Sequence, residues 1–309
     1  MSFTILIPID FSEVTELQIE SAIPFCRAKG VEILLLHLLE PNRWTEQPRK
    51  KQEQDGCDPV ERIEVLRAKL DAKIQGQANV TAKVKVGSPA DTILSQIHST
   101  KSDLVILGSQ NHPPLLSTIC AGSVARSLLL ASPVPILLVL PGADPLPPVL
   151  QQITLGVDFG PSTGTLLHQA EVLARRVGAN LRAVHITRPP KHLRYHHDRN
   201  PTPEDLTKVK KIESYGKTKF RRLLKFEELT AEDFDYAVEV GESVPKLLEL
   251  GTQSDLLILG SHGHGRCFDL IMGSVSRTMI QKSKRPVLIV PVGVSQEKAE
   301  VPYPRVASL

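Results

Sequence analysis

Short runs of apolar residues recur along the chain and alternate with longer stretches of helical periodicity. At residues 255–259 an aspartate precedes four consecutive apolar positions, a pattern typical of a strand buried on both faces. Further along, Val275, Met279 and Ile280 have helical spacing and predict a helix over 274–283. In each half the order reads strand, helix, strand, variable segment, and then helix and strand three times. This alternation predicts an α/β fold with a doubly wound parallel sheet.

The whole pattern occurs twice, so the chain is a tandem duplication. The segment Ile5–Ser12 matches Ile153–Gly160, with an aspartate directly after the strand in both copies. Later, Asp103–Ser109 matches Asp255–Ser261. Four single residues between these segments match at one constant offset: Ala22, Gly30, His37 and Pro41 with Ala170, Gly178, His185 and Pro189.

Each copy has about 150 residues, the usual size of one domain with its own core. We therefore expect a first domain over 1–140 and a second over 151–294, followed by a polar tail over 295–309. The joint over 141–150 is rich in proline. Because proline continues neither a helix nor a strand, this composition favours an extended, semi-rigid spacer.

A glycine-rich run follows the 255–259 strand and has the composition of a phosphate site. Residues 260–265 read Gly-Ser-His-Gly-His-Gly, and Gly-Ser-Val-Ser at 273–276 opens the next helix. In parallel sheets ligands bind at the carboxyl ends of strands, where the free amides of helix N-termini favour anions. We expect Ser274 to be the N-cap of that helix. The spacing fits neither the P-loop nor the dinucleotide-binding fingerprint.

The spacing Gly260-x2-Gly263-x9-Gly273-Ser274 resembles the ATP-binding signature of the universal stress protein family. Three further segments resemble landmarks of that family in the same order: a first strand with its aspartate at 153–158, a second strand at 183–186 and a last strand at 285–290. The resemblance implies five strands per half, with the last strand at an edge where sister domains pair. It thus implies two five-stranded domains that form a pseudo-twofold dimer within one chain, with ATP as the ligand.

The residues expected to hold ATP belong to the glycine run and to neighbouring strand ends. They are Asp158, Ile186, Gly260, Ser261, His262, Gly263, His264, Gly265, Arg266, Gly273, Ser274, Val275 and Ser276. Asp158 would accept from an adenine amino group or a ribose hydroxyl; its alternative role is to cap the following helix. His262 and His264 are expected to contact phosphate or ribose, because the run lacks the further ligands of a zinc site. Arg266 either adds positive charge for the phosphates or is a solvated loop residue.

The first half departs from the signature at its own glycine run. Asn111 stands where the second glycine is due, and Gly122 and Ser123 follow one place late. Pro113 and Pro114 remove two amide donors from the expected phosphate site. We therefore expect this half to bind ATP weakly or not at all. The residues that it would use are Asp10, Leu38, Gly108, Gly122 and Ser123.

Composition is that of an ordinary globular protein, with 41% hydrophobic and 23% charged residues. A net charge of +3 is too small to argue for nucleic acid, and no apolar run is long enough to span a membrane. The sequence starts almost directly in a strand and leaves no room for a signal peptide. The four cysteines, Cys26, Cys57, Cys120 and Cys267, lack metal-ligand spacing. We therefore expect a cytoplasmic protein with reduced thiols.

Two inserts follow the second strands of the two halves. Residues 42–58 are polar and are expected to form a flexible loop. Residues 188–225 are strongly basic and have helical spacing from Lys208 onward. Those charges are either a solvated helix face or the binding site of an anionic partner. A metal site is a further alternative for three histidines of this insert, His192, His196 and His197.

Three functions remain open at this point. The first is an ATP-binding regulatory protein of the stress response, with ATP, alone or with magnesium, held mainly in the second half. The second is a slow ATPase or a self-phosphorylating protein with Ser274 or Ser276 as acceptor, although no catalytic base is evident in the run. The third is a scaffold without ligand that acts through a regulatory protein partner. A monomer with an internal pseudo-dimer and a homodimer are both compatible with the sequence.

Overall fold

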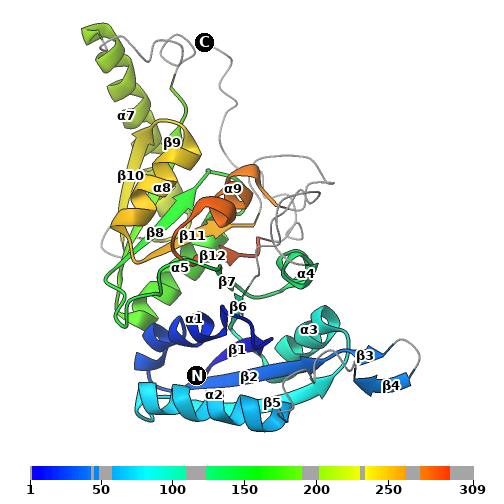
Figure 1. Cartoon of the computed structure of the whole chain (residues 1–309). Helices are drawn as coiled ribbons and strands as arrows, with labels where there is room; N and C mark the ends of the chain where they lie inside the picture. Colours follow the sequence, from blue (N-terminus) through cyan, green and yellow to red (C-terminus); the bar gives the residue numbers. More distant parts are fainter. Residues whose placement is uncertain are drawn as a thin grey trace.

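The structure is a computed structural model that describes residues 2–42, 45–48, 58–108, 123–189, 202–229, 234–261 and 272–292 (Figure 1). The sheet strands of the first half are β1 (Phe3–Ile9), β2 (Val31–Leu39), β5 (Asn79–Val86), β6 (Leu104–Gly108) and β7 (Ile136–Val139). Its helices are α1 (Thr15–Glu20), the 3₁₀ helix η1 (Ile23–Arg27), α2 (Pro59–Ile74), α3 (Pro89–Thr100) and α4 (Ser123–Ala131).

The second half repeats this order. Its strands are β8 (Gln152–Val157), β9 (Asn180–Thr187), β10 (Asp235–Val240), β11 (Leu256–Gly260) and β12 (Val287–Val290). Its helices are α5 (Thr163–Val177), α7 (Pro203–Phe226), α8 (Ser243–Gln253) and α9 (Ser274–Lys282). The alternation of strands and helices predicted from the hydrophobic pattern is confirmed.

The two halves share one continuous sheet. Its ten strands have the order β10-β9-β8-β11-β12-β7-β6-β1-β2-β5. Neighbouring strands within each half are parallel, whereas β7 and β12 pair antiparallel at the centre. The last strand of each half is therefore the edge through which the halves pair, as the family resemblance implied.

The register of the central pair is symmetric. Leu137 of β7 lies opposite Leu288 of β12, and these two residues are equivalent positions of the sequence repeat. All residues of both strands are buried, so the junction is a continuation of the core. A pseudo-twofold axis thus passes between Leu137 and Leu288, and the predicted pseudo-dimer within one chain is confirmed.

Helices cover both faces of the sheet (Figure 1). Residues of α1, α2, α5 and α7 share one apolar core with η1, and residues of α3, α4, α8 and α9 share the other. The first core also buries Leu146 and Leu150, which belong to the proline-rich joint. In addition, the Asp144 N–H donates to the Lys284 carbonyl oxygen at 2.7 Å. The joint has no helix or strand, but it is anchored to the core and does not hold the halves apart.

The prediction of a flexible loop over 42–58 is wrong for the part that the structure describes. Residues Pro41–Asn42 (β3) and Thr45–Pro48 (β4) form a small antiparallel sheet. Asp58 is the N-cap of α2 and accepts from the Val60 N–H at 3.0 Å. The two short strands satisfy the hydrogen bonds of each other's backbone. Their polar composition lacks the apolar pattern from which strands are predicted, so the sequence did not indicate them. Residues 43–44 and 49–57 lie outside the described residues.

Two helix glycines lead to opposite predictions for stability. A Cβ at Gly216 of α7 would lie 2.6 Å from the Val238 Cγ1 atom of β10, whereas a Cβ at Gly251 of α8 would meet no atom within 4 Å. We expect Gly216→Ala to lower the free energy of unfolding by about 1–2 kcal/mol, because overpacking outweighs the better helix propensity of alanine. Gly251→Ala should raise it by about 0.5–1 kcal/mol. Urea unfolding measures both changes in the free energy of unfolding. Equal changes for the two variants would contradict the close packing of Gly216 against Val238.

Candidate functional site

The candidate site lies where β8 and β11 end, next to each other in the sheet. Their parallel ladder stops at Leu155↔Ile258, and each strand extends two residues further before it ends. Asp158 follows β8 directly, and Gly260 is the last residue of β11. The sequence predicted this meeting of Asp158 with the start of the glycine run, and the structure brings the two strand ends together. Ligands bind at such points in open α/β sheets.

The two carboxylate oxygens of Asp158 differ in the hydrogen bonds that they accept from the described residues. Asp158 Oδ1 accepts from the Gly160 N–H at 2.8 Å and from the Thr163 hydroxyl at 3.4 Å. Asp158 Oδ2 is buried and has no hydrogen-bond partner among the described residues. The alternative role of Asp158 as a helix cap is wrong, because α5 begins at Thr163 and Ser162 holds the cap position. Asp158 instead closes the turn before that helix and keeps one acceptor available.

Phe159 positions this turn, and it was not among the residues predicted for the site. Its backbone has a φ of 58°, a value uncommon for a bulky side chain. Its ring packs at a tilt against that of His185 with centroids 4.2 Å apart, and His185 Nδ1 lies 2.8 Å from the Val157 carbonyl oxygen. Strain of this kind persists only where the surroundings fix the residue. The repeated pair of an Asp-Phe dipeptide and a histidine on the next strand was the signal that could have found it.

The first half contains the same arrangement. Phe11 has a φ of 56° and its ring centroid lies 4.6 Å from that of His37. His37 Nδ1 lies 2.8 Å from the Ile9 carbonyl oxygen. Burial lowers the pKa of His37, so the ring is neutral at physiological pH and Nδ1–H donates this bond. The duplication has therefore preserved the strained turn in both halves.

Ser261 joins the two ends of the glycine run. Its N–H donates to the Val290 carbonyl oxygen at 2.8 Å, and its carbonyl oxygen accepts from the Gly273 N–H at 2.9 Å. Its hydroxyl oxygen accepts from the Val292 N–H at 3.1 Å. The residue is only 3% exposed. Ser261 was expected to contact the ligand, but its groups are engaged in closing the loop and holding it to β12.

The start of α9 differs from the prediction by one residue. Gly273 is the N-cap and Ser274 is the first helical residue, so the assignment of Ser274 as the cap is wrong. The backbone of Gly273 takes the extended cap conformation, and its carbonyl oxygen accepts from the Arg277 N–H at 3.0 Å. The amides of Ser274, Val275 and Ser276 have no acceptor among the described residues. These amides are the groups with which a helix N-terminus binds an anion.

The two candidate serines of α9 have different environments. Ser274 is exposed. Ser276 is buried, and its hydroxyl donates to the Gly260 carbonyl oxygen at 2.8 Å. Ser276 therefore ties α9 to the end of β11, and its oxygen is committed to that contact.

The remaining predicted residues divide into two groups. Ile186 and Val275 are partly buried against the apolar core on the face that α8 and α9 cover. Five residues of the glycine run lie outside the described residues: His262, Gly263, His264, Gly265 and Arg266. The histidines His192, His196 and His197 of the basic insert also lie outside them.

The equivalent site of the first half is closed by a glutamine. Gln18 of α1 is 1% exposed, and its Nε2 donates to the carbonyl oxygens of Pro8 at 2.9 Å and Ile106 at 3.3 Å. A Cβ on Gly108 would lie 2.7 Å from both Gln18 and Val14, so these side chains fill the space beside the strand end. The equivalent of Gln18 in the second half is Leu166. The sequence comparison did not single out this difference.

The other predicted residues of the first half do not form an acceptor site. Asp10 is exposed, and its Oδ1 accepts from the Ser12 N–H at 3.0 Å. Leu38 is buried in the core and Ser123 is the first residue of α4. Gly122, Asn111, Pro113 and Pro114 lie outside the described residues.

Clustered metal ligands and thiols are sparse among the described residues. Within the described ranges, no group of three or more histidine, cysteine, aspartate or glutamate side chains is placed to hold a metal ion. Cys26 is buried, and burial raises the pKa of its thiol to about 12, which keeps it protonated and unreactive. Cys57, Cys120 and Cys267 lie outside the described residues. None of the described helices is both long enough and apolar enough to cross a membrane.

Known proteins share this architecture along most of the chain. A universal stress protein of Mycolicibacterium smegmatis is 24% identical over 302 residues, which cover 93% of this chain and 97% of that protein. A universal stress protein of Mycobacterium tuberculosis is 26% identical over 222 residues, covering 71% of this chain and 68% of that protein. The crystal structure of a universal stress protein from Archaeoglobus fulgidus has the same fold, with a TM-score of 0.62, 19% identity and coverage of 95% and 97% of the two chains.

The model of the Universal stress protein family matches the chain twice, over residues 1–139 and 150–291. These two matches correspond to the two halves of the sheet and together include nearly all of the described residues. The chain therefore belongs to the universal stress protein family and contains two copies of the family domain in tandem.

Proposed function

We propose that the chain binds ATP in its second half and acts as a nucleotide-dependent regulatory protein. The observation that carries this proposal is Asp158 Oδ2, a buried carboxylate oxygen without a partner among the described residues. Leaving such an atom unpaired costs free energy, and a ligand donor would recover it. The amino group of adenine or a ribose hydroxyl is a donor of the required kind.

The phosphate end of the ligand has its own support. The amides of Ser274, Val275 and Ser276 lie in the first turn of α9, and Ser261 holds the start of that helix to the end of β11, the strand beside β8. Helix N-termini attract anions through these amides and through the helix dipole. The residues that would hold ATP are thus Asp158 for the nucleoside and the first turn of α9 for the phosphates. A magnesium ion, where present, would be held by the phosphates.

One site per chain follows from the contrast between the halves. Gln18 fills the space beside Gly108, and Asp10 is an exposed residue without a buried oxygen to satisfy. A buried oxygen without a partner beside Gly108 is Gln18 Oε1, which belongs to a neutral amide, so this strand end of the first half offers no carboxylate equivalent to Asp158 Oδ2. We propose that it acts as the structural partner of the second half through β7 and β12.

Thermal unfolding of the purified chain tests the proposal. A ligand that binds the native state alone stabilises it by about 2.7 kcal/mol at 100 times its dissociation constant. We expect millimolar ATP to raise the midpoint and inorganic triphosphate to raise it less, because triphosphate lacks a donor for Asp158. If ATP does not shift the midpoint, the proposal is wrong. If ATP and triphosphate shift it equally, Asp158 does not contribute to nucleotide binding.

Self-phosphorylation is the second candidate, and one observation favours it at a single residue. Ser274 is exposed at the start of α9, where a phosphate group is favourable, whereas the Ser276 hydroxyl is buried and bound to Gly260. With γ-labelled ATP and magnesium, we expect any label to disappear in Ser274→Ala and to persist in Ser276→Ala. Absence of label in the unmodified chain would exclude this function.

A further inference from the structure

One helix has a net positive charge larger than that of the whole chain. The 24-residue helix α7 has eight basic and three acidic side chains, a formal net charge of +5. The whole chain has a net charge of only +3, so the residues outside α7 sum to −2. Figure 1 shows α7 on the outer edge of the second half, with its first turns extending beyond the sheet. The charge is therefore concentrated at one accessible place.

The basic residues of α7 form two rows on its outward side. Lys210, Lys217, Arg221 and Lys225 follow one another at i, i+7, i+11 and i+15, and Lys211 and Arg222 form the row beside them. All six side chains are exposed, and none pairs with a carboxylate within the described residues. The opposite side of the helix buries Gly216, Phe220, Leu223 and Leu224. We call these six residues the basic face; by helix rise it spans about 22 Å.

Exposed aromatic residues flank the basic face. Tyr215 follows Lys211 by four positions and is 50% exposed, and Phe226 follows Arg222 by four positions and is 66% exposed. Aromatic side chains beside arginine are the usual composition of protein contact sites. The surface thus combines charge with apolar area.

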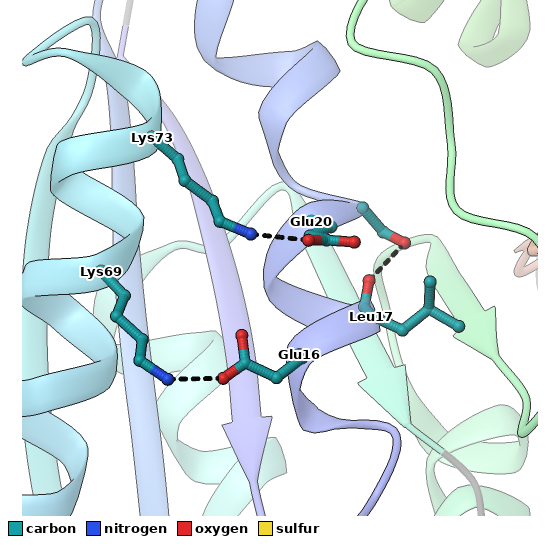
Figure 2. Close-up of polar contacts among 6 residues, drawn as sticks. Glu16, Leu17, Glu20, Lys69 and Lys73 are labelled. Carbon is teal, nitrogen blue, oxygen red and sulfur yellow. Dashed lines mark hydrogen bonds and ion pairs between the residues drawn. The ribbon is translucent and has the colours of Figure 1, made fainter.

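The equivalent helix of the first half has no such surface. Helix α2 packs against its own edge strand, as α7 does, but it carries four basic and three acidic residues. Lys69 donates to Glu16 at 2.8 Å and Lys73 to Glu20 at 2.6 Å, so the lysines of α2 tie it to α1 (Figure 2). The fold therefore does not require a helix with unpaired basic residues at this position.

The basic face also works against the stability of α7. Lys217 and Arg221, and again Arg221 and Lys225, are like charges four positions apart, which destabilise a helix. A feature that opposes folding and is absent from the equivalent helix points to a binding role.

We propose that the basic face of α7 is the docking surface for an acidic helical segment of a partner protein. Carboxylates at the same spacing on such a segment would meet the two rows, and apolar side chains between them would cover Tyr215 and Phe226. A long nucleic acid duplex is less well matched, because it would extend past α7 over a remainder of the chain with net negative charge. A membrane is less well matched because the apolar face of α7 is already buried against β10. This surface is independent of the proposed nucleotide site.

Fluorescence anisotropy with a labelled peptide tests the proposal on the full chain. The probe is a helix-forming peptide of about 18 residues with leucines and with glutamates in two rows on one side; the control peptide has glutamine in place of every glutamate. At about 0.15 M salt, we expect the glutamine peptide to bind at least tenfold more weakly. We expect Arg221→Glu to weaken binding of the glutamate peptide at least tenfold and Phe226→Ala to weaken it severalfold.

The matched control is Lys85→Glu, which makes the same change of net charge on β5 at the opposite edge of the sheet. This variant should bind as the unmodified chain does. Urea unfolding should show that Arg221→Glu is at least as stable as the unmodified chain, because it replaces like-charge neighbours by opposite ones. Three results would overturn the proposal: equal losses for Arg221→Glu and Lys85→Glu, tighter binding of a 16-base-pair duplex or of phosphatidylserine vesicles than of the peptide, or no peptide binding.

Discussion

Gln18→Leu is expected to lower the free energy of unfolding by about 2–3 kcal/mol, although leucine is the equivalent residue in the second half. The reason lies in Pro8 of β1, which has no N–H. The ladder between β1 and β6 ends at Leu6↔Val105, whereas the equivalent ladder between β8 and β11 continues for one more pair. Gln18 Nε2 donates to the carbonyl oxygens of Ile106 and Pro8 and so supplies a donor that the strand lacks. Without it, two buried acceptors would lose their partner.

A double-mutant cycle tests this explanation. At the position of Pro8 the second half has Gly156, which has an N–H. In the Pro8→Gly background we expect Gln18→Leu to cost about 1 kcal/mol less, because the strand then provides the donor to the Ile106 carbonyl oxygen and only that of residue 8 loses its partner. Urea denaturation of the four proteins gives the coupling energy. The same cost of Gln18→Leu in both backgrounds would contradict the account.

Asp158→Asn is expected to weaken ATP binding about 10- to 100-fold, the range of one hydrogen bond to a charged group. The asparagine carbonyl oxygen would still accept from the Gly160 N–H, which leaves the turn intact. Its amide nitrogen would then replace Oδ2 and would present a donor to the donor of the ligand. Calorimetric titration with ATP measures the change, and unfolding of the variant shows that the fold is retained.

The matched control is Asp10→Asn in the first half, which should leave ATP affinity unchanged because Asp10 is exposed. Inosine triphosphate has no exocyclic amino group, so its binding shows whether the adenine amino group is the donor to Asp158. If Asp158 binds that amino group, inosine triphosphate should bind the unmodified chain weakly and should lose little more in Asp158→Asn. Equal weakening by Asp10→Asn and Asp158→Asn would contradict a site confined to the second half.

The sequence was sufficient for the architecture of this protein. Buried strands such as 255–259 and their repetition in the first half predicted two doubly wound sheets, and the family resemblance predicted their pairing through the last strands. Hydrophobic runs predict these strands because a strand that is covered on both faces buries all of its side chains and therefore consists mainly of apolar residues. The positions of Asp158 and Gly260 at neighbouring strand ends followed from the same pattern.

The details that the sequence missed depend on backbone groups. Ser274 was assigned as a cap because serine favours that position, but Gly273 holds it through its backbone conformation. Ser261 was assigned to the ligand because it lies within the glycine run, yet its bonds to Val290, Val292 and Gly273 close the loop. Gln18 was missed because a polar residue in a short helix has no distinctive signal until its strand neighbour, Pro8, is known to lack a donor. The hydrophobic and glycine patterns behind the predictions would be the same with or without these contacts.

The number of ATP molecules bound per chain decides whether ATP binding is confined to the second half, since the two halves share a fold but differ at Asp158 and Gln18. Isothermal titration of the purified full chain with ATP gives this number together with the affinity. We expect about one ATP per chain, with binding weakened by Asp158→Asn and not by Asp10→Asn. Two equivalent sites per chain, or no binding at all, would contradict this expectation.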